Sequence, residues 1–109
     1  MRYYPLFVDL KGKICCVIGG GGVAERKVRA LLKCHARVKV YSPELTAGLE
    51  KLCKAREIAC RRSGFEKNFL RGAFLVVAAT NNRLINSRIS PALTRSHRHT
   101  IVSFVILWT

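Results

Sequence analysis

The sequence predicts a doubly wound α/β domain built on one parallel β-sheet, with strand order 3-2-1-4-5 and right-handed crossovers. Two observations lead to this fold class. Short apolar runs, typical of buried parallel strands, alternate along the chain with stretches whose apolar residues recur at helical spacing. Four consecutive glycines also follow the first apolar run and precede the first helical stretch. The 109 residues are enough for one domain with a single hydrophobic core.

The expected strands and helices alternate along the chain. The first strand is Ile14–Ile18, a helix runs from the glycines to Cys34, and a second strand covers Arg37–Tyr41. A second helix is expected to begin at Ser42, because a serine that can cap is followed there by a proline and a glutamate. The remaining expected elements are strands at 57–62 and 74–79, a weak helix at 84–90 and a fifth strand at 101–108.

The glycines carry the first functional signal. The spacing Gly19-x-Gly21-x-x-Ala24 matches a dinucleotide-binding fingerprint placed between a strand and a helix. In this pattern Gly19 lets the chain turn, Gly21 lets a pyrophosphate approach the backbone, and Ala24 lets helix and strand pack closely. The phosphates would meet free N–H groups and the positive end of the helix dipole. A purely structural glycine turn is the alternative interpretation.

The chain is strongly basic. Twenty Lys and Arg against six Asp and Glu give a formal net charge of +14. Such a surplus indicates an anionic partner, either nucleic acid, an anionic membrane or an acidic small molecule. Nucleic acid is the less favoured partner, because the basic residues are scattered and no aromatic platform accompanies them. No membrane span is expected, since no stretch reaches the roughly 18 apolar residues that a spanning helix needs.

The cysteines and histidines predict no metal site. Five cysteines, an odd number without a CxxC pair, argue against a disulfide framework or a cysteine zinc site. Cys15 and Cys16 lie in the expected first strand and are predicted core residues. His97 and His99 have strand-like spacing, but no acid or cysteine lies near them in the sequence. Reduced thiols and the absence of an export signal at the start lead us to expect a cytoplasmic protein.

Several longer motifs add to the glycine fingerprint. They are Tyr4-Pro5-Leu6-Phe7-Val8-Asp9-Leu10, Val17-Ile18-Gly19-Gly20-Gly21-Gly22-Val23-Ala24-Glu25-Arg26-Lys27, Ala36-Arg37-Val38, Ser42-Pro43-Glu44-Leu45, and the run from Phe74 to Thr80 with Asn81-Asn82. With these motifs the chain resembles the N-terminal domain of siroheme synthase, the precorrin-2 dehydrogenase and sirohydrochlorin ferrochelatase family, over about residues 1–90. The resemblance implies a Rossmann-like fold and NAD-dependent oxidation of precorrin-2 to sirohydrochlorin, with iron insertion in some members.

The resemblance also implies cofactor contacts. They are Gly22 and Val23 for the pyrophosphate and adjacent ribose, Pro43 and Glu44 for the adenosine, and Thr80 and Asn81 for the nicotinamide half. NAD is expected rather than NADP through the resemblance alone, because Tyr41 and Ser42 stand where an acid would bind the ribose hydroxyls. The substrate that the resemblance implies, precorrin-2, is a tetrapyrrole with many carboxylates, which the basic residues of this chain would attract. Family members form homodimers, a state that the sequence does not decide for this chain.

One departure from the family concerns catalysis. The family places an aspartate, as general base and metal contact, within an Asn-Val-Val-Asp sequence in the strand after the helix that follows Thr80. Residues 100–107 contain no acid here, so no catalytic residue is assigned. We expect one cofactor-binding domain over 1–109 that is part of an enzyme. Residues 91–109 diverge from the family, and a frameshifted end would explain this divergence. A nucleic-acid-binding protein and a regulatory NAD sensor are the alternatives.

Overall fold

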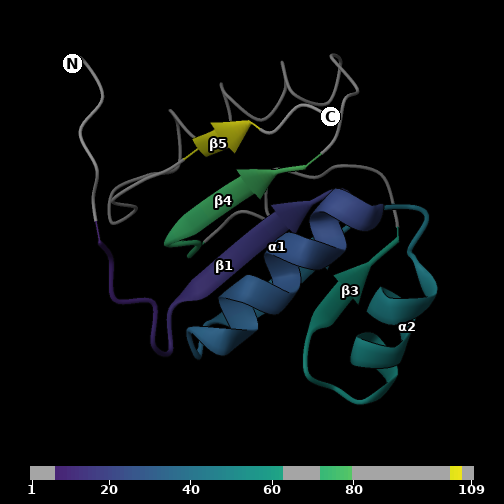
Figure 1. The fold of residues 1–109 in the computed structure, drawn as a ribbon, viewed down its shortest axis with the longest axis horizontal. Helices are drawn as coiled ribbons and strands as arrows, with labels where there is room; N and C mark the ends of the chain where they lie inside the picture. Colours follow the sequence, from purple (N-terminus) through teal and green to yellow (C-terminus); the bar gives the residue numbers. More distant parts are fainter. Residues whose placement is uncertain (1–6, 63–71, 80–103, 107–109) are drawn as a thin grey trace.

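The computed structural model describes residues 7–62, 72–79 and 104–106. Within these residues, five strands form one sheet in the order β3-β2-β1-β4-β5, and every neighbouring pair is parallel (Figure 1). The predicted fold class and strand order are therefore confirmed. The elements in chain order are β1 (Ile14–Ile18), α1 (Gly22–Lys33), β2 (Arg37–Tyr41), α2 (Ala47–Lys54), β3 (Ala59–Arg61), β4 (Leu75–Ala78) and β5 (Phe104–Ile106).

The central strand β1 aligns the ends of its two neighbours. Its last residue, Ile18, lies opposite Tyr41 of β2 and Ala78 of β4. Three strands therefore end at the same level, and the segments that leave them meet at one edge of the sheet. In open parallel sheets this carboxyl edge is where ligands bind.

The core lies between the sheet and the two helices. Alternate residues of β1 and β2 pack with one stripe of α1 and with Leu49 of α2 in a single cluster of buried residues. Cys16 and Ile18 of β1 are also buried, which is expected for a parallel strand covered on both faces. Cys15 and Cys16 are both fully buried, so their predicted place in the core is confirmed.

Helix α1 is amphipathic as its sequence pattern predicts. Ala24, Val28 and Leu31 are buried, and the exposed side carries the basic residues. The helix ends with Cys34 as C-cap, and the next residue, His35, adopts a left-handed conformation with φ of 61°. Glycine usually occupies that position, so a histidine there is held in a backbone region that few side chains adopt.

The second helix does not begin at Ser42, as its sequence signals predict, but at Ala47 with Thr46 as N-cap. The Ser42 side chain is buried, and its hydroxyl donates to the Glu44 carbonyl at 2.7 Å and accepts from the Glu44 amide at 3.3 Å. This hydroxyl therefore closes a local turn, an alternative to helix capping that serine readily takes. Pro43 and Glu44 lie in that turn.

The other strands are shorter than predicted. β3, β4 and β5 cover the central residues of the predicted ranges 57–62, 74–79 and 101–108. Ile58 is buried just before β3. The weak helix predicted at 84–90 lies outside the described residues. In the described ranges, neither helix has the length and hydrophobicity to cross a bilayer.

Candidate cofactor site

Two of the four glycines are required by packing. Gly19 has φ of 132°, and a Cβ there would collide with the carbonyl group of Ala79, whose carbon would lie only 2.8 Å away. A Cβ on Gly20 would collide with the Glu44 carbonyl oxygen and lie 2.6 Å from the Ser42 hydroxyl oxygen. The turn is therefore held between the segment that leaves β2 and the segment that leaves β4. Only residues without a side chain fit in this space.

The other two glycines are open. Gly21 and Gly22 are exposed, and no described heavy atom lies within 4 Å of the place where a Cβ would be attached. The N-cap of α1 is Gly21, which has no side chain to cap the helix, and the first intrahelical hydrogen bond runs from the Glu25 amide to the Gly21 carbonyl at 3.0 Å. The amides of the first three helical residues therefore have no intrahelical acceptor. This end of the helix could hold a diphosphate, because it offers amide donors and a positive dipole, and no side chain of the described residues blocks it.

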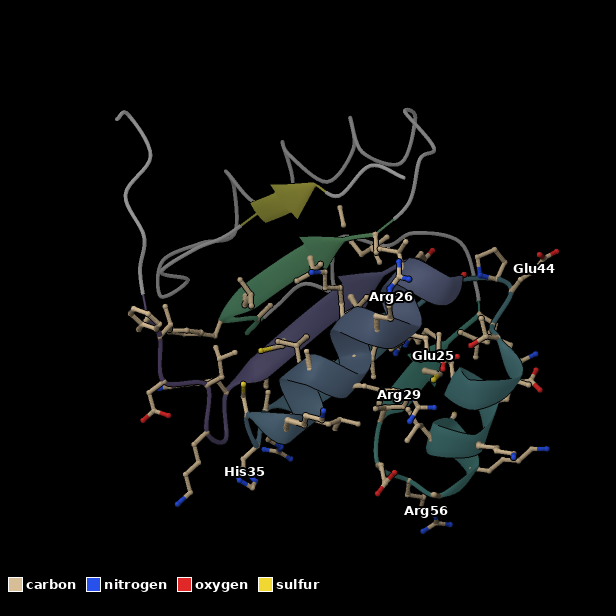
Figure 2. The ribbon with its side chains drawn as sticks, in the orientation of Figure 1. Glu25, Arg26, Arg29, His35, Glu44 and Arg56 are labelled. Carbon is tan, nitrogen blue, oxygen red and sulfur yellow. The ribbon has the colours of Figure 1, made fainter. Side chains whose placement is uncertain are left out.

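The segment after β2 lies against this turn. The amide of Gly19 donates to the Tyr41 carbonyl at 2.9 Å, and the amide of Thr46 donates to the Gly20 carbonyl at 3.0 Å. Pro43 and Glu44, between these two contacts, are exposed. Figure 2 shows Glu44 at the margin of the molecule, on the connection between β2 and α2.

The structure thus brings most of the sequence-predicted contacts to one edge of the sheet. Gly19, Gly21, Gly22, Val23, Pro43 and Glu44 all lie in the two segments that meet at the carboxyl ends of β1 and β2. Thr80 and Asn81 lie outside the described residues. Ala79, immediately before them, donates its amide to the Ile18 carbonyl at 2.7 Å and contacts Gly19. The chain therefore leaves β4 beside the glycine turn.

The charged side chains in the first half of α1 point in different directions, some toward α2 and one toward the glycine end of the helix. Glu25 and Arg29 lie between α1 and α2, whereas the exposed Arg26 lies nearer the glycine end of α1 (Figure 2). The Thr46 hydroxyl donates to the Glu25 carboxylate at 2.5 Å, and Arg29 pairs with the same carboxylate at 3.2 Å. These contacts, the Thr46 hydrogen bond first, hold the pKa of Glu25 below its usual value.

Sequence reasoning missed three residues of this arrangement. Gly20 is skipped by the fingerprint, yet it has the tightest surroundings of the four glycines. Thr46 was not predicted as a cap, although a threonine before a helical apolar pattern is a standard start signal. Glu25 lies outside the apolar stripe of α1, and its contact with Thr46, twenty-one positions later, has no local signal.

Among the described residues, no cluster of metal-binding side chains lies at this edge. Strand β5 pairs with β4 next to the site, and its three residues include no acid. Among the residues that the structure describes, no group of three or more His, Cys, Asp or Glu side chains is placed to hold a metal ion.

A parallel sheet with an open glycine turn at the start of its first helix defines a dinucleotide-binding domain. The chain belongs to the family described as "Putative NAD(P)-binding", whose model matches residues 6–105. The expected resemblance is confirmed: siroheme synthase from Photorhabdus laumondii is 40% identical over 89 residues, which are 82% of this chain and 19% of that protein. Siroheme synthase 1 from Klebsiella pneumoniae is 37% identical over 98 residues, covering 90% and 21%.

A solved structure shares the fold. The structure of SirC, precorrin-2 dehydrogenase, matches with a TM-score of 0.79 and 25% identity, covering 93% of this chain and 48% of that one. The chain therefore spans about a fifth of the length of these curated relatives and about half of that structure.

Proposed function

We propose that this chain binds NAD at the glycine turn and is the cofactor-binding part of a precorrin-2 dehydrogenase. One observation carries the proposal: the open backbone of Gly21 and Gly22 lies at the uncapped N-terminus of α1, between the segments that leave β2 and β4. The family membership and the siroheme synthase relatives support it independently. The net charge of +14 suits a dianionic pyrophosphate and a substrate with many carboxylates.

Each proposed contact has a distinct task. The amides of Gly22 and Val23 bind the pyrophosphate and adjacent ribose, and the open face of Gly21 gives the pyrophosphate room to approach. Pro43 and Glu44 border the adenosine. For the nicotinamide half, the proposed contacts are Thr80 and Asn81, two polar residues that follow β4 in the sequence.

The proposed reaction is the oxidation of precorrin-2 to sirohydrochlorin, in which bound NAD accepts a hydride. The chain's own residues bind the cofactor and orient it at the carboxyl edge of the sheet. The aspartate that the resemblance implies as general base has no counterpart in residues 100–107, which contain no acid. We therefore propose that this chain binds the cofactor but does not complete the oxidation, or an iron insertion, by itself.

Calorimetric titration of the purified chain with NAD and NADP at physiological salt tests the binding step. We expect saturable binding of NAD with one site per chain, and weaker binding of NADP. Gly22→Asp is the matched variant, because it places a carboxylate at an open position beside the proposed pyrophosphate. Absence of saturable NAD binding would contradict the proposal, and tight retention of DNA at the same salt would favour a nucleic-acid-binding protein instead.

A second experiment separates an enzyme from a sensor. The chain is mixed with NAD and precorrin-2 at stoichiometric concentrations, and NADH formation is followed by its absorbance. We expect NAD to bind without NADH formation. NADH formation at a rate above that of the free reactants would show that another group replaces the missing aspartate.

A further inference from the structure

Three hydrogen bonds connect the glycine turn to the starts of both helices, and the peptide bond between Gly20 and Gly21 closes them into a ring. The Gly20 carbonyl accepts from the Thr46 amide at 3.0 Å. The Thr46 hydroxyl donates to the Glu25 carboxylate at 2.5 Å, and the Glu25 amide donates to the Gly21 carbonyl at 3.0 Å. The ring therefore fixes two consecutive carbonyl groups of the turn, directly before the amides that have no intrahelical acceptor.

Thr46 has a double task in this ring. Its hydroxyl oxygen also accepts from the Leu49 amide at 3.2 Å, so the same side chain caps α2. One hydroxyl thus donates to the start of α1 and accepts from the start of α2. Serine can reproduce both bonds, whereas valine, with the same shape, can make neither.

The Glu25 carboxylate rests directly on the first turn of α2. A Cβ on Gly48 would lie 2.5 to 2.6 Å from its carboxylate atoms, so the absence of a side chain at Gly48 makes room for it. A negative charge is favourable at a helix N-terminus. The contact also turns this carboxylate, which belongs to the first turn of α1, toward α2 (Figure 2). If it pointed instead toward a pyrophosphate bound at the start of α1, the two negative charges would repel each other.

We infer that Glu25 and Thr46 are positioning residues for the cofactor, which hold the glycine turn in its binding shape without contacting the cofactor themselves. The inference rests on the proposed NAD site. It makes the start of α2 part of the binding machinery, although that helix supplies no proposed contact. Loss of the ring is expected to lower NAD affinity more than it lowers stability.

The first test compares Thr46→Val with Thr46→Ser, measuring the NAD dissociation constant by calorimetry and the melting temperature without ligand. We expect Thr46→Val to raise the dissociation constant about tenfold, and Thr46→Ser to keep it within about twofold of the parent value. Glu25→Ala is expected to act like Thr46→Val. Glu50→Ala is the matched control, because it removes a side-chain contact of α2, the ion pair with Arg62 at 2.8 Å, that is not part of the ring.

Gly48→Ala separates positioning from stability. Alanine favours a helix more than glycine does, so the variant is expected to melt at the same temperature as the parent or higher. Its methyl group nevertheless displaces the Glu25 carboxylate, and we expect the NAD dissociation constant to rise about fivefold. In a Glu25→Ala background the same substitution should have no further effect on NAD binding, because the displaced group is already absent.

The outcomes distinguish the two proposals. If the parent binds NAD and both Thr46→Val and Gly48→Ala bind it equally well, the positioning role is wrong and the proposed function stands. If the parent itself fails to bind NAD, the proposed function is wrong and the positioning role falls with it. Should Thr46→Val fail to fold, Gly48→Ala and its double variant with Glu25→Ala still decide the question.

Discussion

Alanine substitutions at two neighbouring glycines should affect different properties: Gly20→Ala should lower stability, and Gly21→Ala should lower NAD affinity. Gly20→Ala places a methyl group against the Glu44 carbonyl oxygen and 2.6 Å from the Ser42 hydroxyl oxygen. A backbone carbonyl cannot rotate away as a side chain can, so the turn at 42–46 must shift. Gly21→Ala meets no described atom within 4 Å, and its φ of −90° and ψ of −165° suit any residue.

The magnitudes follow from this geometry. Forced insertion of a methyl group into packed surroundings costs about 1–3 kcal/mol, and the rigid carbonyl places Gly20→Ala near the upper end. For a chain of 109 residues, 1 kcal/mol corresponds to about 4 °C in melting temperature, so a loss of about 10 °C is expected. Gly21 is the N-cap of α1, where alanine is less favourable than glycine, but alanine also restricts the unfolded chain. The two effects oppose each other, so Gly21→Ala should change the free energy of unfolding by less than about 1 kcal/mol.

NAD titration of the same two variants completes the comparison. Gly21→Ala is expected to keep its stability and to lose NAD affinity by about tenfold or more, because its methyl group enters the proposed pyrophosphate position. Thermal unfolding and calorimetry measure the two effects separately. A Gly20→Ala variant as stable as the parent would refute the packing argument, and a Gly21→Ala variant with unchanged NAD affinity would refute the proposed cofactor position.

Three further predictions concern the rest of the described chain. Because the folded-state pKa of Glu25 is lowered, its contribution to stability is complete above the ordinary glutamate pKa and is lost as pH falls through the lowered value. Urea unfolding between about pH 6 and pH 3 should therefore show a shallower pH dependence for Glu25→Gln than for the parent. Leu49→Ala should reduce the free energy of unfolding by about 2–5 kcal/mol in the same assay, because this side chain is fully buried in the core; a loss below 1 kcal/mol would contradict its place there. Burial raises the pKa of Cys16 to about 12, so native alkylation followed by mass spectrometry should label the exposed Cys34 first and Cys16 last.

The sequence predicts the sheet well because its signals are strong there. The apolar run of β1, the alternation of β2 and the fingerprint between them each have a local physical cause. The alternation of strands with helices along the whole chain then predicts the strand order. Cys15 and Cys16 could be placed in the core because both faces of a central parallel strand are buried.

The predictions fail where two local signals compete or where a contact is long-range. Ser42-Pro43-Glu44 is a stronger helix-start pattern than Thr46, but the Ser42 hydroxyl closes a turn that packs on Gly20. That preference depends on a neighbour from another part of the chain, which periodicity cannot reveal. The ring that joins Glu25 to Thr46 also depends on residues far apart in the sequence, and so does the tight space at Gly20. Both features belong to the candidate site.

The position of β1 between β2 and β4 also affects how the chain is assembled on the ribosome. Cys15 pairs with Val38, twenty-three positions later, but its partner on the other side is Leu75, sixty positions later. One edge of this central strand therefore stays unpaired until much of the chain has been synthesised. During this interval the exposed edge can pair with another nascent chain, and the many positive charges oppose such association through mutual repulsion.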